Sequence, residues 1–164
     1  MLSPRLDITV EQLAGVEKCL DNLQQETEAR WVLLTDVTGQ FISGCGLLCS
    51  MNSLNVEALS ALAAGNLATT REMARLTGEE ARFKLLLYEG ERQSVYLSDV
   101  GGEFVLVIAF DNSVSISAVR LYTKQTVDRL QEILHRARAT VSPPPVGLDE
   151  DFGQLLASEM EFSF

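Results

Sequence analysis

Three cysteines, one histidine and a pair of close glycines are the residues whose chemistry first needs an interpretation. Cys19, Cys45 and Cys49 are an odd number, without metal-ligand spacing or histidine neighbours, which favours reduced thiols over a disulfide or a metal site. His135 has no catalytic or metal partner near it in the sequence, and we interpret it as a surface residue at a basic helix end. Because no acid–base pair, activated nucleophile or metal cluster is evident, we expect no catalytic residue, no metal and no cofactor.

Gly44 and Gly46 form a GxG pattern that invites comparison with phosphate-binding loops. The stretch lacks both the third glycine of the dinucleotide motif and the GK[ST] ending of a P-loop, so we reject a nucleotide site there. A net charge of -10 and a pI near 4.5 argue against nucleic acid and anionic membranes as partners. The sequence has no apolar run of about 18 residues and no visible secretory signal, so we expect a cytoplasmic globular protein.

The element that must position any functional residue is a long helix predicted from Leu54 to Gly78. Asn52 and Ser53 offer caps before it, and Gly78 follows as a stop. A stripe at three- and four-residue steps is expected to lie on a sheet: Leu59, Leu62, Asn66, Thr69, Met73 and Leu76. A second face carries small residues where a solvated helix would place charges, namely Ala61, Ala64, Gly65 and Ala68, followed by Glu72. This track indicates either an alanine-rich core helix or a surface for close contact with another molecule.

The flanking elements predict a mixed α/β fold with helices on the faces of a five-stranded antiparallel sheet. A capping box at Thr9 and Gln12 begins the first helix, and a polar segment at 111–115 begins the last, which spans roughly 116–139. Short turns join the first two strands to each other and the last three strands in succession, which makes antiparallel pairing the natural arrangement. The expected strands are 30–35, 40–45, 83–89, 92–98 and 103–110.

The ordered set of motifs resembles the Roadblock (dynein light chain) superfamily, and within it the bacterial MglB type. The motifs are DVTG at 36–39, LAAGN at 62–66, LTGE at 76–79 and VLVIAFDNSVSISAVRL at 105–121, and the likeness covers about 10–139. The resemblance implies a homodimer that joins central helices and edge strands of two subunits. It also implies an MglA-type small GTPase as partner, which the dimer stimulates to hydrolyse GTP in control of cell polarity or motility.

The strand predicted at 83–89 would expose unpaired amides beside apolar side chains if it formed a free sheet edge. Pairing with a second copy would remove that hazard, and closed two-fold assemblies are the commonest kind. We therefore predict a dimer edge at Phe83, Leu85, Leu86 and Leu87.

Arg71 and Arg75 on the long helix are the residues that could donate positive charge to a phosphoryl-transfer transition state. The resemblance implies otherwise, because in MglB-type partners the catalytic groups come from the GTPase, so both arginines are expected to be contact or surface residues. The predicted partner-binding set is Ala61, Ala64, Gly65, Ala68, Thr69, Arg71, Glu72 and Arg75. Two alternatives stay open: an interaction scaffold that does not activate its partner, and a small-ligand sensor domain.

The C-terminal region divides from the Roadblock-like domain, predicted to span 1–139, at a proline-rich linker of residues 140–148. Residues 149–164 are acidic and carry apolar side chains on one helical stripe, which favours a peptide that folds on binding a groove with basic rims over a solubilising tail. The predicted tail contacts are Phe152, Leu155, Leu156 and Met160.

Overall fold

The computed structural model describes residues 8–78 and 85–141, and it confirms the mixed α/β fold. Each predicted helix and strand is present within two residues of its expected bounds, and a short 3-10 helix, η1, follows the second strand. The elements are α1 (Val10–Thr27), β1 (Trp31–Asp36), β2 (Phe41–Gly46), η1 (Leu47–Ser50), α2 (Ser53–Thr77), β3 (Leu85–Glu89), β4 (Gln93–Val100), β5 (Phe104–Asp111) and α3 (Ile116–Val141).

All five strands form one antiparallel sheet in the order β2-β1-β5-β4-β3. The two strands at the centre, β1 and β5, are the most apolar, and pairs such as Leu33 with Val107 lie opposite each other. Both are buried almost throughout because helices cover both faces of the sheet. β2 and β3 form the two edges, so the prediction of β3 as an edge strand is confirmed.

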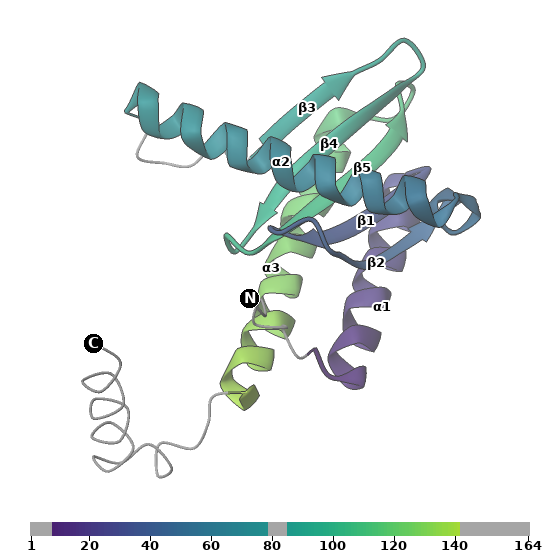
Figure 1. Ribbon diagram of the computed structural model, residues 1–164. Helices are drawn as coiled ribbons and strands as arrows, with labels where there is room; N and C mark the ends of the chain where they lie inside the picture. The colour runs from purple at the N-terminus through teal and green to yellow at the C-terminus, as the bar shows by residue number, and fades with distance from the viewer. Residues whose placement is uncertain (1–7, 79–84, 142–164) are drawn as a thin grey trace, which may run out of the picture.

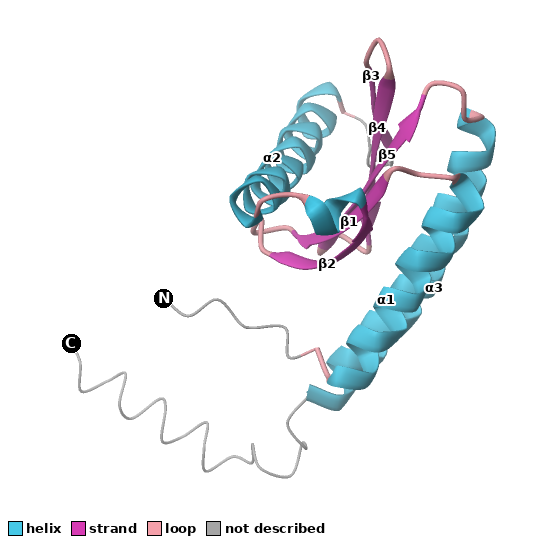
Figure 2. Cartoon of the chain, turned by 90° about the vertical axis from the view of Figure 1, so that its right-hand side faces the viewer, coloured by secondary structure: helices cyan, strands magenta, loops and turns pink. Residues whose placement is uncertain are grey.

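The sheet separates two helical layers of different make-up. Figure 2 shows α1 and α3 side by side on one face and α2 alone on the other. The layer on the α1 and α3 side contains large buried side chains, among them Leu20, Leu23, Ile108, Phe110 and Leu130. The layer under α2 is smaller and is filled mainly from the strands, by Trp31, Leu33, Leu97, Val105 and Val107.

The local sequence explains where the helices start and stop. At α1, the Thr9 side chain accepts from the Gln12 amide while the Gln12 side chain accepts from the Thr9 amide, which confirms the capping box. At α2, Asn52 Oδ1 accepts from the Leu54 amide at 3.0 Å. Gly78 ends α2 in the left-handed conformation with φ +74°, where a glycine avoids the strain that a side chain would add.

Several predicted residues lie outside the described part of the chain. They are Phe83, most of the linker at 140–148 and the tail contacts Phe152, Leu155, Leu156 and Met160. α3 continues to Val141, so a linker can begin no earlier than residue 142. None of the helices within residues 8–78 and 85–141 is long and apolar enough to cross a bilayer.

Candidate docking surface on helix α2

The face of α2 that packs on the sheet consists mostly of small side chains. Ser60, Ala63, Ala64, Leu67 and Ala74 are buried. The Ser60 hydroxyl donates to the Val56 carbonyl oxygen at 2.9 Å, so its polar group is satisfied inside the helix. The strand side chains beneath are bulky and already fill the space between the layers. Small helix residues are therefore what allows α2 to approach the sheet closely.

This packing corrects the predicted orientation of α2. The stripe expected to face the sheet points largely to solvent, with Leu62 65%, Met73 56% and Leu76 70% exposed. The helix is rotated so that Leu67, with Leu59 half-buried beside it, meets the layer formed by Trp31 and Leu33, and the other large side chains of the expected stripe point outward. Towards its C-terminus α2 also extends past the strands (Figure 1).

The result is an exposed apolar surface along the whole helix, which we name the α2 outer face. Its residues follow one another at three- and four-residue steps and are all exposed. Patches of large apolar side chains that run over several helical turns usually mark interaction sites, because isolated soluble domains rarely keep them. The α2 outer face consists of Leu54, Ala58, Ala61, Leu62, Gly65, Ala68, Thr69, Met73 and Leu76.

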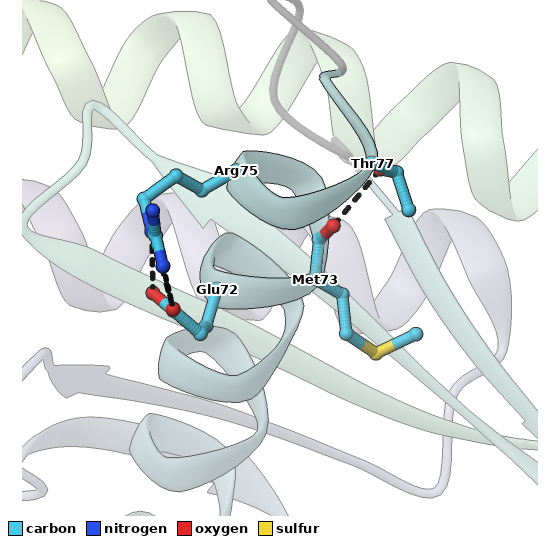
Figure 3. A network of polar contacts seen from close by, with 4 residues as sticks. All are labelled: Glu72, Met73, Arg75 and Thr77. Atoms are coloured by element: carbon cyan, nitrogen blue, oxygen red, sulfur yellow. Dashed lines mark hydrogen bonds and ion pairs between the residues drawn. The ribbon is translucent and has the colours of Figure 1, made fainter.

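In the C-terminal half of the helix, the exposed charges Glu72 and Arg75 pair with each other. The Arg75 guanidinium donates through Nε to both Glu72 carboxylate oxygens at 3.1 Å (Figure 3). The hydrogen bond from Arg75 lowers the pKa of Glu72 and raises that of Arg75. Figure 3 also shows the Met73 side chain extending away from this pair. Glu72 lies four residues after Ala68 and four before Leu76, so the C-terminal half of the face is apolar except for one internally paired charge couple.

Gly65 leaves the middle of the face open. A methyl group added at Gly65 would meet nothing within 4 Å, so no packing inside the described chain requires a glycine there. A glycine inside a helix costs about 1 kcal/mol against alanine, so its presence is compatible with a role in close contact to another molecule. By contrast, Gly39 in the turn between β1 and β2 has φ +92°, and a Cβ atom added to it would lie 3.0 Å from the Ala61 Cα atom.

The β3 edge lies beside the same helix. The Tyr88 hydroxyl donates to Asn66 Oδ1 at 2.8 Å, which ties the edge strand to the middle of α2, and Tyr88 is 46% exposed. Leu86 and Leu87 are half-buried and pack on opposite faces of the sheet. The outer backbone edge of β3 and the α2 outer face therefore belong to one side of the molecule.

The predicted partner-binding residues divide into three groups. Ala61, Gly65, Ala68, Thr69, Glu72 and Arg75 are exposed. Ala64 is only 6% exposed and packs on the sheet, so its place in a contact surface is wrong. Arg71 is folded back onto the strands: its Nη2 donates to the Gly102 carbonyl oxygen at 2.8 Å. Sequence reasoning missed Leu54, Leu62, Met73 and Leu76; the signal was that α2 is apolar on every side.

Two of the three cysteines, Cys19 and Cys45, are buried. Burial raises the pKa of Cys19, and burial together with the charge of Asp21 raises the pKa of Cys45 to about 12. Cys49 is exposed. Within the described residues no three histidine, cysteine or acidic side chains are placed to hold a metal.

A hollow of about 450 Å³ lies away from α2, between α3 and the turn that joins β4 to β5. Val100, Phe104 and Leu134 line it together with Glu103 and Glu132, two residues that have interactions within the chain. No pattern in the sequence indicated that these residues meet.

A family model for the Roadblock/LC7 domain matches residues 15–110, from α1 to the end of β5. The chain belongs to the Roadblock/LC7 family. Solved structures agree with this assignment. MglB of Myxococcus xanthus is 31% identical with a TM-score of 0.71, over 84% of this chain and 95% of that one. The gliding protein MglB of Thermus thermophilus is 30% identical with a TM-score of 0.73, over 82% and 99%.

Another structure, described as MglB with tetrameric arrangement, is 29% identical with a TM-score of 0.74 over 83% and 99%. A Roadblock/LC7 domain from Streptomyces avermitilis shares the fold at 15% identity and a TM-score of 0.66. No curated protein matches the sequence. The Roadblock/LC7 assignment and the likeness to MglB confirm the family that the ordered motifs suggested.

Proposed function

We propose that this chain is an MglB-type activator that binds a Ras-like small GTPase of the MglA type and stimulates its GTP hydrolysis, in cytoplasmic control of cell polarity or motility. The observation that carries the proposal is the α2 outer face, an apolar surface left uncovered by the described chain, in a protein about 30% identical to two MglB proteins. A face of this kind supplies the apolar contact that the core of a protein interface needs.

The active form that we propose is a homodimer joined through β3. An exposed sheet edge is an unstable feature unless a second strand pairs with it. The C-terminal end of α2 extends past the sheet on that side (Figure 1). Antiparallel pairing of two β3 strands about a two-fold axis would place this end of each helix over the sheet of the other subunit. One operation would thus pair the edges and give the overhanging end of each helix a sheet to lie on, with both α2 outer faces left open for the GTPase.

The activation that we propose works by holding the GTPase in a competent conformation. Both arginines of α2 have partners within their own chain: Arg75 is paired with Glu72, and Arg71 binds the turn after β4. A group that stabilises the transition state must be placed within hydrogen-bond distance of the phosphoryl oxygens, so the required charges are assigned to the GTPase itself. We further propose that the tail residues Phe152, Leu155, Leu156 and Met160 add a second contact to the GTPase.

The deciding experiment measures phosphate release by an MglA-type GTPase from the same organism, with and without the full chain. Activators of small GTPases raise hydrolysis rates by as much as about 10⁵, so an increase of about tenfold or more is expected. A variant with Ala68→Arg on the α2 outer face serves as the inactive control. A stable complex with an unchanged rate of GTP hydrolysis would show that the chain is a scaffold and not an activator. The absence of any complex would overturn both functions.

A further inference from the structure

Arg71 links the C-terminal half of α2 to the turn between β4 and β5 through side-chain hydrogen bonds. Its Nη2 atom donates to the Gly102 carbonyl oxygen at 2.8 Å and lies 3.5 Å from Asp99 Oδ1. The side chain is 33% exposed, and its Nε atom is buried without a partner in the described chain. A buried guanidinium nitrogen without a partner costs free energy. The contacts of Nη2 with Gly102 and Asp99 must therefore hold the side chain in this position.

The receiving turn is itself well defined. Asp99 Oδ1 accepts from the Gly102 amide at 2.9 Å, and the Glu103 amide donates to the Val100 carbonyl oxygen at 3.3 Å. Gly101 and Gly102 have φ +64° and +81°. A methyl group at Gly101 would lie 3.6 Å from the Gln131 side chain, so the turn also approaches α3 on the opposite layer. Arg71 therefore binds an anchored loop.

The C-terminal half of α2 has little else to fix it. Beyond Leu67, Ala74 is the one buried residue of the helix within the described chain. An alanine side chain provides only a small contact area and no directional bond. Between the sheet and the residues after Leu67, Arg71 supplies the hydrogen bonds that the structure shows. They add to the packing of Ala74 in fixing the rotation of this half of the helix, which determines where Met73 and Leu76 point.

We propose that Arg71 is a positioning residue, which holds the overhanging half of α2 in the rotation that presents Met73 and Leu76 for docking. It contacts neither the nucleotide nor the partner. The expected effect on GTPase binding rests on the proposed function. The positioning of α2 by Arg71 does not depend on any partner. The planar guanidinium reaches a carbonyl and a carboxylate together, which a lysine ammonium does less well.

The test compares Arg71→Met, which keeps the aliphatic stem, with Arg71→Lys and with two controls in the full chain. Arg75→Met removes the neighbouring arginine, which bonds to Glu72 on its own helix. Val16→Ala is a core change on α1, in the opposite layer. The readouts are global stability by urea unfolding, amide hydrogen exchange at residues 72–77, and affinity for the MglA-type GTPase loaded with a non-hydrolysable GTP analogue.

Arg71→Met is expected to speed exchange at 72–77 about tenfold and to weaken GTPase binding about tenfold, with Arg71→Lys between it and the wild type. Both controls should keep wild-type exchange at 72–77, and Val16→Ala should keep wild-type binding although it lowers stability. If Arg71→Met binds as well as a Val16→Ala protein of equal stability, or leaves exchange unchanged, the proposal is overturned. If Arg71→Met does not fold, Arg71→Lys is judged by the same two readouts.

Failure of the proposed function looks different. In that case the wild-type chain binds no GTPase, and amide exchange of Arg71→Met alone decides the role of Arg71. Faster exchange at 72–77 supports a positioning role for Arg71, and unchanged exchange excludes it.

Discussion

The two helical layers of this protein use their large side chains in opposite ways. On the α1 and α3 side, Leu20, Leu23 and Leu130 point inward and are fully buried. On the other side, α2 buries Leu67 among small residues such as Ala63 and Ala64, and presents Leu54, Leu62 and Leu76 to solvent. A helix that served only the core of its own chain would gain more by the reverse rotation, since each large apolar side chain contributes about 1.5–3 kcal/mol when buried. The difference indicates that α2 keeps its larger face for another molecule.

The sharpest test of this difference uses two alanines one helical turn apart. Ala64 is buried on the sheet and Ala68 is exposed. Ala64→Arg should lower the free energy of unfolding by about 4 kcal/mol or more, because it forces a charge and extra volume between packed layers. Ala68→Arg should change it by no more than about 0.5 kcal/mol. Urea unfolding followed by circular dichroism measures both.

The same pair separates folding from docking. Ala68→Arg should remain folded and lose the partner complex in size-exclusion chromatography, since the arginine would have to be buried without a counter-charge. Equal stabilities for the two variants would mean that α2 has a different rotation in solution. An intact complex with Ala68→Arg would exclude the middle of the α2 outer face as the docking surface.

Two leucines extend the comparison to the opposite layer. Leu20→Ala removes a side chain with no exposed area and should cost about 2–5 kcal/mol of stability, from lost burial and the cavity left behind. Leu62 is 65% exposed, so Leu62→Ala should lower the free energy of unfolding of the monomer by no more than about 0.5 kcal/mol. Unfolding measured at low protein concentration gives these values. Leu62→Ala should also weaken the complex with the MglA-type GTPase, because it removes an apolar contact from the α2 outer face, and size-exclusion chromatography detects this. A Leu62→Ala cost as large as that of Leu20→Ala would contradict the outward orientation.

The fold was predictable because its signals are local. The capping box at Thr9, the turn at 36–39 and the apolar strand at 105–110 each specify one structure, and the ordered motifs identified the family. The orientation of α2 was not predictable in the same way. Leu62 and Ala64 both satisfy helical periodicity, and the choice between them depends on Trp31 and Leu33 from a distant strand. A helix that is apolar on all sides has no rotation specified by its own sequence.

Arg71 shows the same limit for the candidate site. In sequence it is equivalent to Arg75, and both were expected on the surface. The structure places Arg71 on the turn after β4, about thirty residues away in the chain, because that turn presents a carbonyl and a carboxylate to α2. A long-range contact of this kind leaves no mark in local composition.

The smallest expected effect concerns the cysteines. Their reactivity measures how well the α1 and α3 layer excludes solvent. Burial raises the pKa of Cys45 to about 12, and its Sγ lies 3.5 Å from the Leu20 carbonyl oxygen, to which it donates. The pKa of this thiol in the unfolded chain is near 9.0, so the neutral thiol favours the folded state below that pH, and this contribution is lost as the pH rises towards about 12.

At about pH 8.5, iodoacetamide should modify the exposed Cys49 within minutes and leave Cys19 and Cys45 unmodified until the chain unfolds, because the thiolate is the reactive form. Mass spectrometry of tryptic peptides with and without urea measures this, and Leu20→Ala should expose Cys45 first. Equal labelling of all three cysteines in the native protein would show that the α1 and α3 layer opens as readily as the surface at η1, and the contrast between the two layers would then not hold in solution.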